Sequence, residues 1–138
     1  MQTIRISTFL RWTLLADAAT CLAMGVLMTL GSERLGDRLA LPTSLLFYSG
    51  LSLYPFAGLL LYLATRRKTA AALVWALVIA NALWAFDSLA ILLAGWVTPN
   101  GLGQSFIVLQ ALGVAVLTAL EVIGLKRSAT ELNAAIQN

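Results

Sequence analysis

The sequence has no histidine, one cysteine and few charged residues, and each of these shortages excludes a class of protein. Without histidine the chain lacks the commonest metal ligand and the usual general base. The single cysteine, Cys21, excludes an internal disulfide and a paired-thiol redox site. Charged residues make up 11% of the 138 residues, whereas a soluble domain carries about a quarter. The chain therefore has too little charge to wet the surface of an ordinary soluble domain.

Enzyme motifs are also missing. The sequence contains no CxxC pair, no nucleophile elbow and no phosphate-binding loop. We therefore expect a protein that is not an enzyme and that holds neither a metal nor a cofactor.

The excess of basic over acidic residues does not indicate a nucleic-acid-binding protein. The net charge is +3 and 60% of the residues are hydrophobic. The lysines and arginines lie at the edges of apolar runs, which is where a membrane protein places them. Between residues 69 and 125 only Asp87 and Glu121 are charged. These positions predict a lipid bilayer as partner and no nucleic acid.

Four apolar runs are long enough to cross a membrane as helices, which takes about 20 residues each. They cover residues 12–30, 43–65, 70–94 and 103–125, and a polar tail follows at 126–138. The first run is read as a retained helix, since it is longer than the apolar stretch of a signal peptide. The sequence thus predicts an all-α, polytopic membrane protein. We expect one domain over 1–138, folded as an up-down bundle of four transmembrane helices.

The distribution of lysine and arginine predicts the orientation of these helices. If the N-terminus is cytoplasmic, seven basic residues lie inside and two, Arg34 and Arg38, lie outside. Basic residues favour the cytoplasmic side. We therefore expect both termini in the cytoplasm, in the inner membrane of a bacterium.

Polar residues inside the apolar runs are the candidate functional groups, because lipid offers them no hydrogen bonds. Asp17, Asn81 and Tyr54 fall at similar depths, and Pro55 leaves the carbonyl of Leu51 without its helical donor. These four groups are expected to form one buried cluster. Asp17 also makes the first helix marginal, since a central aspartate costs about 2.5–3.5 kcal/mol on insertion.

A second polar set is predicted toward the outside, with Asp87 in the third helix and Gln110 in the fourth. Gln110 and Glu121 are eleven residues apart, which returns a helix to nearly the same face. We expect Glu121 to lie near the cytoplasmic boundary, where Lys126 or Arg127 neutralises it. The candidate ligand- or ion-binding residues are Asp17, Tyr54, Asn81, Trp84, Asp87 and Gln110. For Asn81 and Gln110, hydrogen bonding between packed helices is the alternative reading.

Two stripes of alanine suggest how the helices pack. Ala72, Ala76 and Ala80 recur every four residues in the third run, and residues 111, 115 and 119 do so in the fourth. Small residues let helix backbones approach closely in a membrane. The stripes therefore predict how the four helices pack on one another. Separately, we expect that the protein can form a homo-oligomer.

Several short segments resemble those of small bacterial four-helix membrane proteins. These segments are Leu15-Ala-Asp-Ala18, Asn81-Ala-Leu-Trp84, Gly95-Trp96…Thr98-Pro99…Leu102-Gly103 and Gln110-Ala-Leu112. The resemblance covers most of the chain and implies the fold and the inner-membrane location. It implies no function.

Two functions are consistent with this pattern. The first is a non-enzymatic helical protein that binds an apolar or lipid-like ligand, or a partner helix, through a polar-lined seam around Asp17, Asn81 and Gln110. The second is a small proton- or cation-coupled transporter in which Asp17 titrates. The small multidrug transporters share the four-helix plan and an acid in the first helix, but not the sequence pattern.

Overall fold

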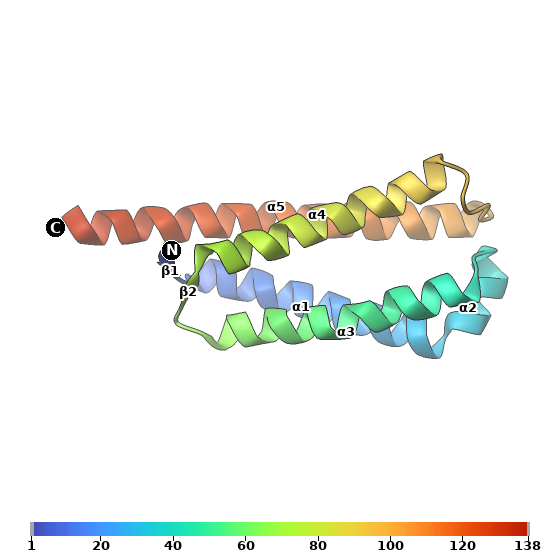
Figure 1. The fold of residues 1–138 in the computed structure, drawn as a ribbon, viewed down its shortest axis with the longest axis horizontal. Helices are drawn as coiled ribbons and strands as arrows, with labels where there is room; N and C mark the ends of the chain where they lie inside the picture. The colour runs from blue at the N-terminus through green and yellow to red at the C-terminus, as the bar shows by residue number, and fades with distance from the viewer. Residues whose placement is uncertain (1, 138) are drawn as a thin grey trace.

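The protein is described by a computed structural model over residues 2–137, and these residues form five helices and one two-stranded sheet (Figure 1). In chain order the elements are β1 (Thr3–Arg5), α1 (Thr8–Leu30), α2 (Ser32–Leu39), α3 (Thr43–Thr65), β2 (Lys68–Ala70), α4 (Ala71–Leu93) and α5 (Gly101–Gln137).

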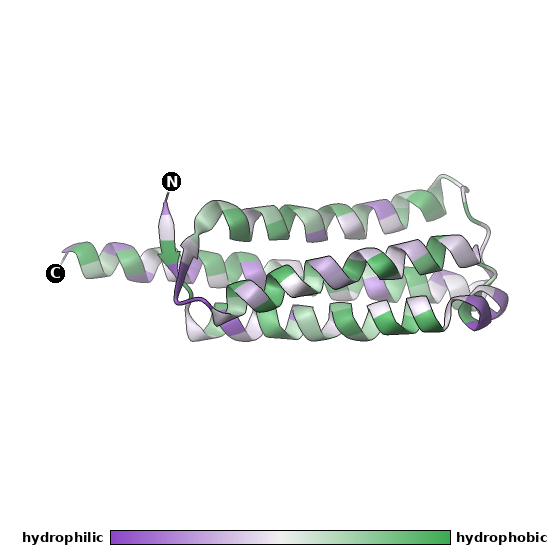
Figure 2. Ribbon diagram, turned by 60° about the horizontal axis from the view of Figure 1, so that its bottom comes forward, coloured by the Kyte–Doolittle hydropathy of each residue, from purple (hydrophilic) through white to green (hydrophobic). Residues whose placement is uncertain are grey.

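Four of the helices, α1, α3, α4 and α5, are long and apolar enough to cross a membrane. The first three of these have 23 residues each, which at 1.5 Å per residue gives about 35 Å, slightly more than the hydrocarbon core. Figure 2 shows apolar residues over most of their length and hydrophilic ones in α2 and in the turn before β2. The limits predicted from the sequence are those of the structure for α3, and they differ by one residue at each end of α4.

Helix α1 begins four residues earlier than the apolar run predicts, because Ser7 caps it. The Ser7 hydroxyl accepts a hydrogen bond from the amide of Leu10 at 3.2 Å. A serine in this position satisfies one of the free amides of the first turn. The cap extends the helix through Arg11, beyond the edge of the apolar segment.

Helix α5 is longer than predicted. It runs for 37 residues without a break from Gly101 to Gln137, about 55 Å, so its last part projects beyond the other helices (Figure 1). The expected separate tail over 126–138 is therefore helical to residue 137, and residue 138 lies outside the described residues. Ser128 lies within α5; it is buried, and its hydroxyl donates to that of Ser7 at 3.1 Å.

A short antiparallel sheet, which the sequence did not predict, joins the N-terminus to the connection between α3 and α4. Strand β1 pairs with β2 so that Ile4 faces Thr69 and Arg5 faces Lys68. Ile4 and Thr69 are buried while both basic residues are exposed. The sheet fixes Thr3–Arg5 at the end of the molecule where α5 projects.

At the opposite end, Asn100 connects α2 to the start of α5. Its side-chain amide donates to the carbonyl of Arg38 at 2.7 Å, and its side-chain oxygen accepts from the amide of Gly103 at 2.9 Å. Gly103 lies so close to the carbonyl of Leu39 that any side chain there would collide with it. This glycine is therefore required by the close approach of the two helix ends.

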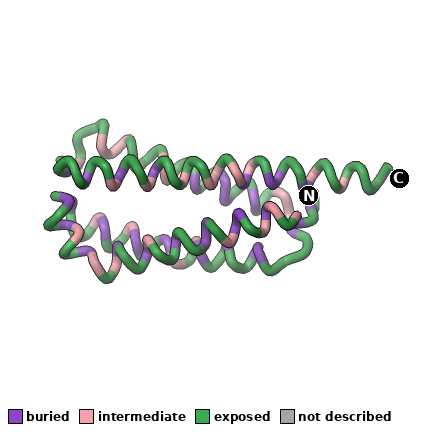
Figure 3. Tube along the Cα trace, turned by 180° about the vertical axis from the view of Figure 1, so that it is seen from behind, coloured by how far each residue is buried: buried purple, intermediate pink, exposed green. Residues whose placement is uncertain are grey.

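The four long helices form two pairs. Helix α1 packs most extensively on α3, and α4 packs on α5, while a smaller contact between α1 and α5 joins the pairs (Figures 1 and 3). Glycines make the first pair close: a Cβ on Gly50 would lie 2.7 Å from Cβ of Met28, and one on Gly25 would lie 3.2 Å from the Gly50 carbonyl oxygen.

The predicted alanine stripes contribute little to this packing. Ala72, Ala76 and Ala80 are exposed on α4, and on α5 only Ala111 is buried while Ala115 is exposed. The expectation that both stripes pack within the chain is therefore wrong. Glycine lets backbones approach more closely than alanine does, and the crossing of α1 and α3 uses it.

The close crossing predicts the effect of adding one methyl group. Gly50→Ala should destabilise the protein by about 1–3 kcal/mol, because the new Cβ overlaps Met28. Gly58, on the same helix, is the matched control, since a Cβ there would meet no atom within 4 Å. Gly58→Ala should leave stability unchanged or slightly raised. Reversible unfolding in mixed detergent measures both, and equal effects of the two substitutions would contradict the proposed crossing.

Candidate ligand-binding site

Asp17, in the middle of α1, points into the protein and is 1% exposed. One carboxylate oxygen accepts from the side-chain amide of Asn81 on α4 at 2.7 Å. The other accepts from the thiol of Cys21, one turn further along α1, at 3.6 Å. The structure thus brings together Asp17 and Asn81, which the depth argument placed at a similar level of the membrane.

A second carboxylate completes this group. The Asn81 amide also donates to Glu121 on α5 at 3.2 Å, so one amide is hydrogen-bonded to both carboxyl groups. Glu121 is fully buried, and its other oxygen, Oε1, has no hydrogen-bond partner in residues 2–137. We refer to Asp17, Cys21, Asn81 and Glu121 as the acid cluster.

The position of Glu121 differs from the sequence prediction, in which Glu121 lies at the cytoplasmic boundary beside Lys126 or Arg127. Lys126 is exposed, and the guanidinium of Arg127 lies over the Phe9 ring at 4.9 Å. The sequence did contain the relevant signal, because the eleven-residue spacing sets Glu121 on the face of Gln110. The error was to assign an acid near a basic pair to the interface.

No basic side chain balances the acid cluster within the described part of the chain. Arg11, the nearest basic residue to Asp17 along α1, instead donates to the carbonyl of Arg66 at 3.1 Å. No other arginine or lysine lies in α1, α3 or α4. Two carboxyl groups therefore share one buried environment with a neutral amide and a thiol.

A cavity of about 480 Å³ opens beside Asp17, and we call it the central cleft. All four long helices line it, and its wall is mostly apolar. The lining residues are Asp17, Thr20, Cys21, Met24, Leu53, Trp84, Phe106, Leu109, Gln110, Gly113, Val114 and Leu117. Glu121 is not among them.

Trp84 and Gln110 form the second polar feature of the cleft. The indole N–H of Trp84 donates to the side-chain oxygen of Gln110 at 3.0 Å, joining α4 to α5. Two smaller cavities, of about 190 and 60 Å³, adjoin the cleft, and Trp84 borders both. The Gln110 side chain thus orients the Trp84 ring, which lines all three cavities.

Two of the predicted site residues lie elsewhere. The Tyr54 hydroxyl is 2.9 Å from that of Thr29, in the contact between α1 and α3, so Tyr54 does not join the acid cluster. Asp87 is exposed on α4 and lines none of the cavities described above. Both were grouped by depth alone, and depth does not specify the face of a helix.

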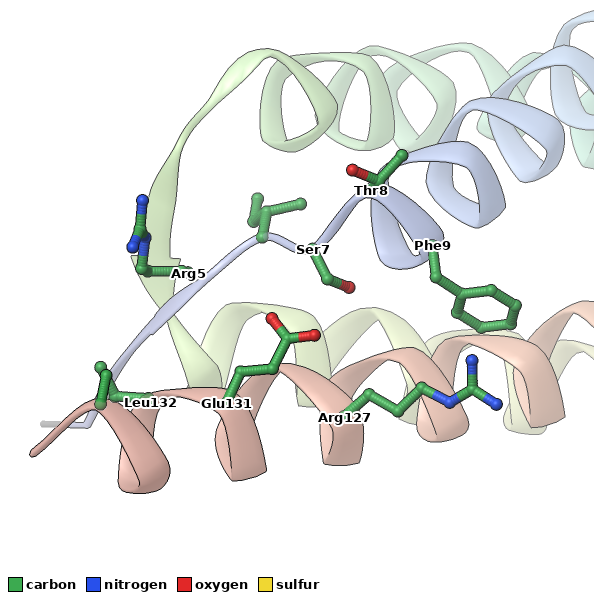
Figure 4. Close-up of a pocket in the computed structure, with 9 residues that line it drawn as sticks. Arg5, Ser7, Thr8, Phe9, Arg127, Glu131 and Leu132 are labelled. Atoms are coloured by element: carbon green, nitrogen blue, oxygen red, sulfur yellow. The ribbon is translucent and has the colours of Figure 1, made fainter. Parts of the chain in front are cut away.

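A separate cavity of about 470 Å³ lies at the end of the molecule that carries the sheet. Figure 4 shows Arg5, the start of α1 and the projecting part of α5 around it, with the Glu131 carboxylate directed toward Ser7 and Arg127 directed toward the Phe9 ring. Arg5, Arg127 and Glu131 are exposed. Because no buried polar group faces this cavity, it is a weaker candidate site than the central cleft.

Comparison with known proteins adds no assignment: no protein-family model, curated protein or solved structure matches the chain significantly. The candidate site is therefore argued from its own geometry.

The acid cluster predicts how Asn81 contributes to stability. Asn81→Leu removes the one donor that both carboxylates share, so the protein should lose about 1–3 kcal/mol of stability in detergent. In a chain that also carries Asp17→Leu and Glu121→Leu, the same substitution should cost little, since no buried acceptor remains unpaired. Equal losses in both backgrounds would show that Asn81 acts through packing alone.

Proposed function

We propose that the protein is a non-enzymatic membrane protein that binds an apolar or lipid-like ligand in the central cleft. The observation that carries this proposal is the cleft itself, a mostly apolar cavity of about 480 Å³ with a few polar groups, Asp17 and Gln110 foremost. Small-molecule sites have this character and a volume of about 300–1,000 Å³. The same volume favours a small ligand over a partner helix.

The exposed residues of the cleft support entry of the ligand from the lipid. Thr20, at mid-height of α1, is exposed, and so are Leu109 and Gly113 on α5. At this height a membrane protein is surrounded by acyl chains. The cleft therefore opens sideways into the hydrocarbon, where hydrophobic ligands concentrate.

For the surroundings of the cleft we propose an up-down four-helix bundle in a bacterial inner membrane, with both termini cytoplasmic. The arrangement of basic residues supports this orientation. Arg5 and Lys68 face each other in the sheet, and Arg11 contacts the backbone of Arg66, so basic residues distant in sequence gather at one end. Basic residues favour the cytoplasmic side of a membrane.

A second function, proton- or cation-coupled transport, is favoured by one observation. Asp17 is not an isolated acid but shares Asn81 with the buried Glu121. Ionisable groups at this depth commonly belong to ion or proton pathways. In this alternative Asp17 is the titrating group and the cleft is one stage of a transport cycle.

Filling the cleft tests the binding function. A photoactivatable 16-carbon alcohol should crosslink to peptides around Met24 and Leu109 in protein reconstituted into lipid nanodiscs. Gly113→Phe should lose most of this labelling, because a Cβ at Gly113 meets no atom within 4 Å and the ring can occupy the cleft. Gly58→Phe is the control, an equally open glycine on α3 outside the cleft. Labelling spread evenly over all helices would refute the binding proposal.

Thiol accessibility tests the orientation. In a Cys21→Ser background, Asp37→Cys in α2 should react with a membrane-impermeant maleimide in spheroplasts. Arg67→Cys, before β2, should react only after permeabilisation. Both positions are exposed, so burial does not limit either reaction. The reverse pattern would place the termini on the outer side.

A further inference from the structure

The acid cluster has an unbalanced charge. Asp17 and Glu121 are 1% and 0% exposed, and the polar groups around them are the neutral side chains of Asn81 and Cys21. A bare carboxylate at membrane depth is expensive, and two neighbouring ones are more so. Glu121 Oε1 moreover has no partner in residues 2–137. The cluster therefore requires a positive charge that the described chain does not supply.

We propose that the central cleft is a site for hydrophobic cations, with the acid cluster as the counter-charge and with a proton held by the cluster when no cation is bound. This proposal deepens the proposed binding function and rests on it. It names the ligand class: a compact apolar body with one positive charge, such as an amphiphilic amine or a phosphonium.

The lining of the cleft supports this class over its alternatives. Asp17 and Cys21 are the members of the acid cluster that line the cleft, so Asp17 supplies the carboxyl group that borders the ligand site. The Trp84 ring, also in the lining, can contribute a cation–π contact. No lysine, arginine or histidine lines the cleft. An anionic ligand would thus meet a carboxylate without a compensating base, whereas a neutral ligand would gain no attraction from the charge of the cluster.

Proton and cation should compete for the same charge. The groups that face the cluster are Cys21 from α1, Asn81 from α4 and Glu121 from α5, and α3 contributes no charged residue. When a cation binds beside Asp17, the proton held by the two carboxyl groups is released to water. Because protons oppose binding, affinity for a cation should rise as the pH rises.

The experiment uses the full chain in phosphatidylcholine nanodiscs and radiolabelled tetraphenylphosphonium, with binding to empty nanodiscs subtracted. Wild-type affinity should rise from pH 5 to pH 9. Asp17→Asn combined with Glu121→Gln should lower the affinity roughly tenfold or more and abolish its pH dependence. Asp17→Asn alone should show a smaller loss. Asp87→Asn, which removes an exposed intramembrane acid outside the cleft, is the matched control and should bind like wild type.

Tetraphenylborate is an anion of the same shape and tests whether binding depends on the positive charge or on apolarity alone. It should not compete with tetraphenylphosphonium for the cleft. Competition by tetraphenylborate equal to that of unlabelled phosphonium would overturn the proposal, and so would unchanged phosphonium binding in the doubly substituted protein. The neutral photoactivatable alcohol reports whether the cleft is intact in each variant. If the alcohol labels the cleft but phosphonium does not bind, the cation proposal fails and the binding function stands. If the alcohol fails to label the wild-type cleft, the binding function fails.

Discussion

The side-chain amide of Asn81 donates to carboxylates on two other helices, and the relation between the two helix pairs depends on this arrangement. Asp17 lies on α1, which packs mainly on α3, whereas Asn81 and Glu121 belong to the α4–α5 pair. In lipid the hydrophobic effect does not drive helices together, so close packing and buried hydrogen bonds must do so. The α1–α3 pair relies on packing around Gly25 and Gly50. Between the pairs, the contact at mid-height is polar.

The central cleft follows from where the two pairs are joined. At one end Ser7 and Ser128 are hydrogen-bonded, and Gly124 lies against Leu10. At the other end Asn100 connects α2 to α5. Between these ends the acid cluster joins α1 to α4 and α5, and Trp84 lines the cleft beside it. The central cleft thus lies beside the acid cluster, between the two ends at which the helix pairs are connected.

The sequence predicted the features that depend on local composition and not those that depend on distant contacts. The lengths of α3 and α4 follow from apolar runs bounded by charges and turns. The relation of Asp17 to Asn81 followed from depth, since two helices of known start bring residues at equal height within reach. Depth does not specify how a helix is rotated about its own axis. For this reason Tyr54 was wrongly grouped with Asp17 and Asn81, and Glu121 was wrongly left out of that group. The sheet joins residues more than sixty positions apart and has three-residue strands, too short for an alternating pattern to reveal.

The packing of the helices does not require an ionisable side chain at position 17. An asparagine there would keep an acceptor for the Asn81 amide and would avoid the insertion penalty that makes α1 marginal, about 2.5–3.5 kcal/mol for a central aspartate. The same holds for Glu121, which accepts one hydrogen bond and leaves Oε1 unpaired. Two ionisable groups thus stand where two amides would serve the structure at lower cost. The added property is the capacity to hold a positive charge, and Asp17 presents that capacity to a cleft open to the lipid.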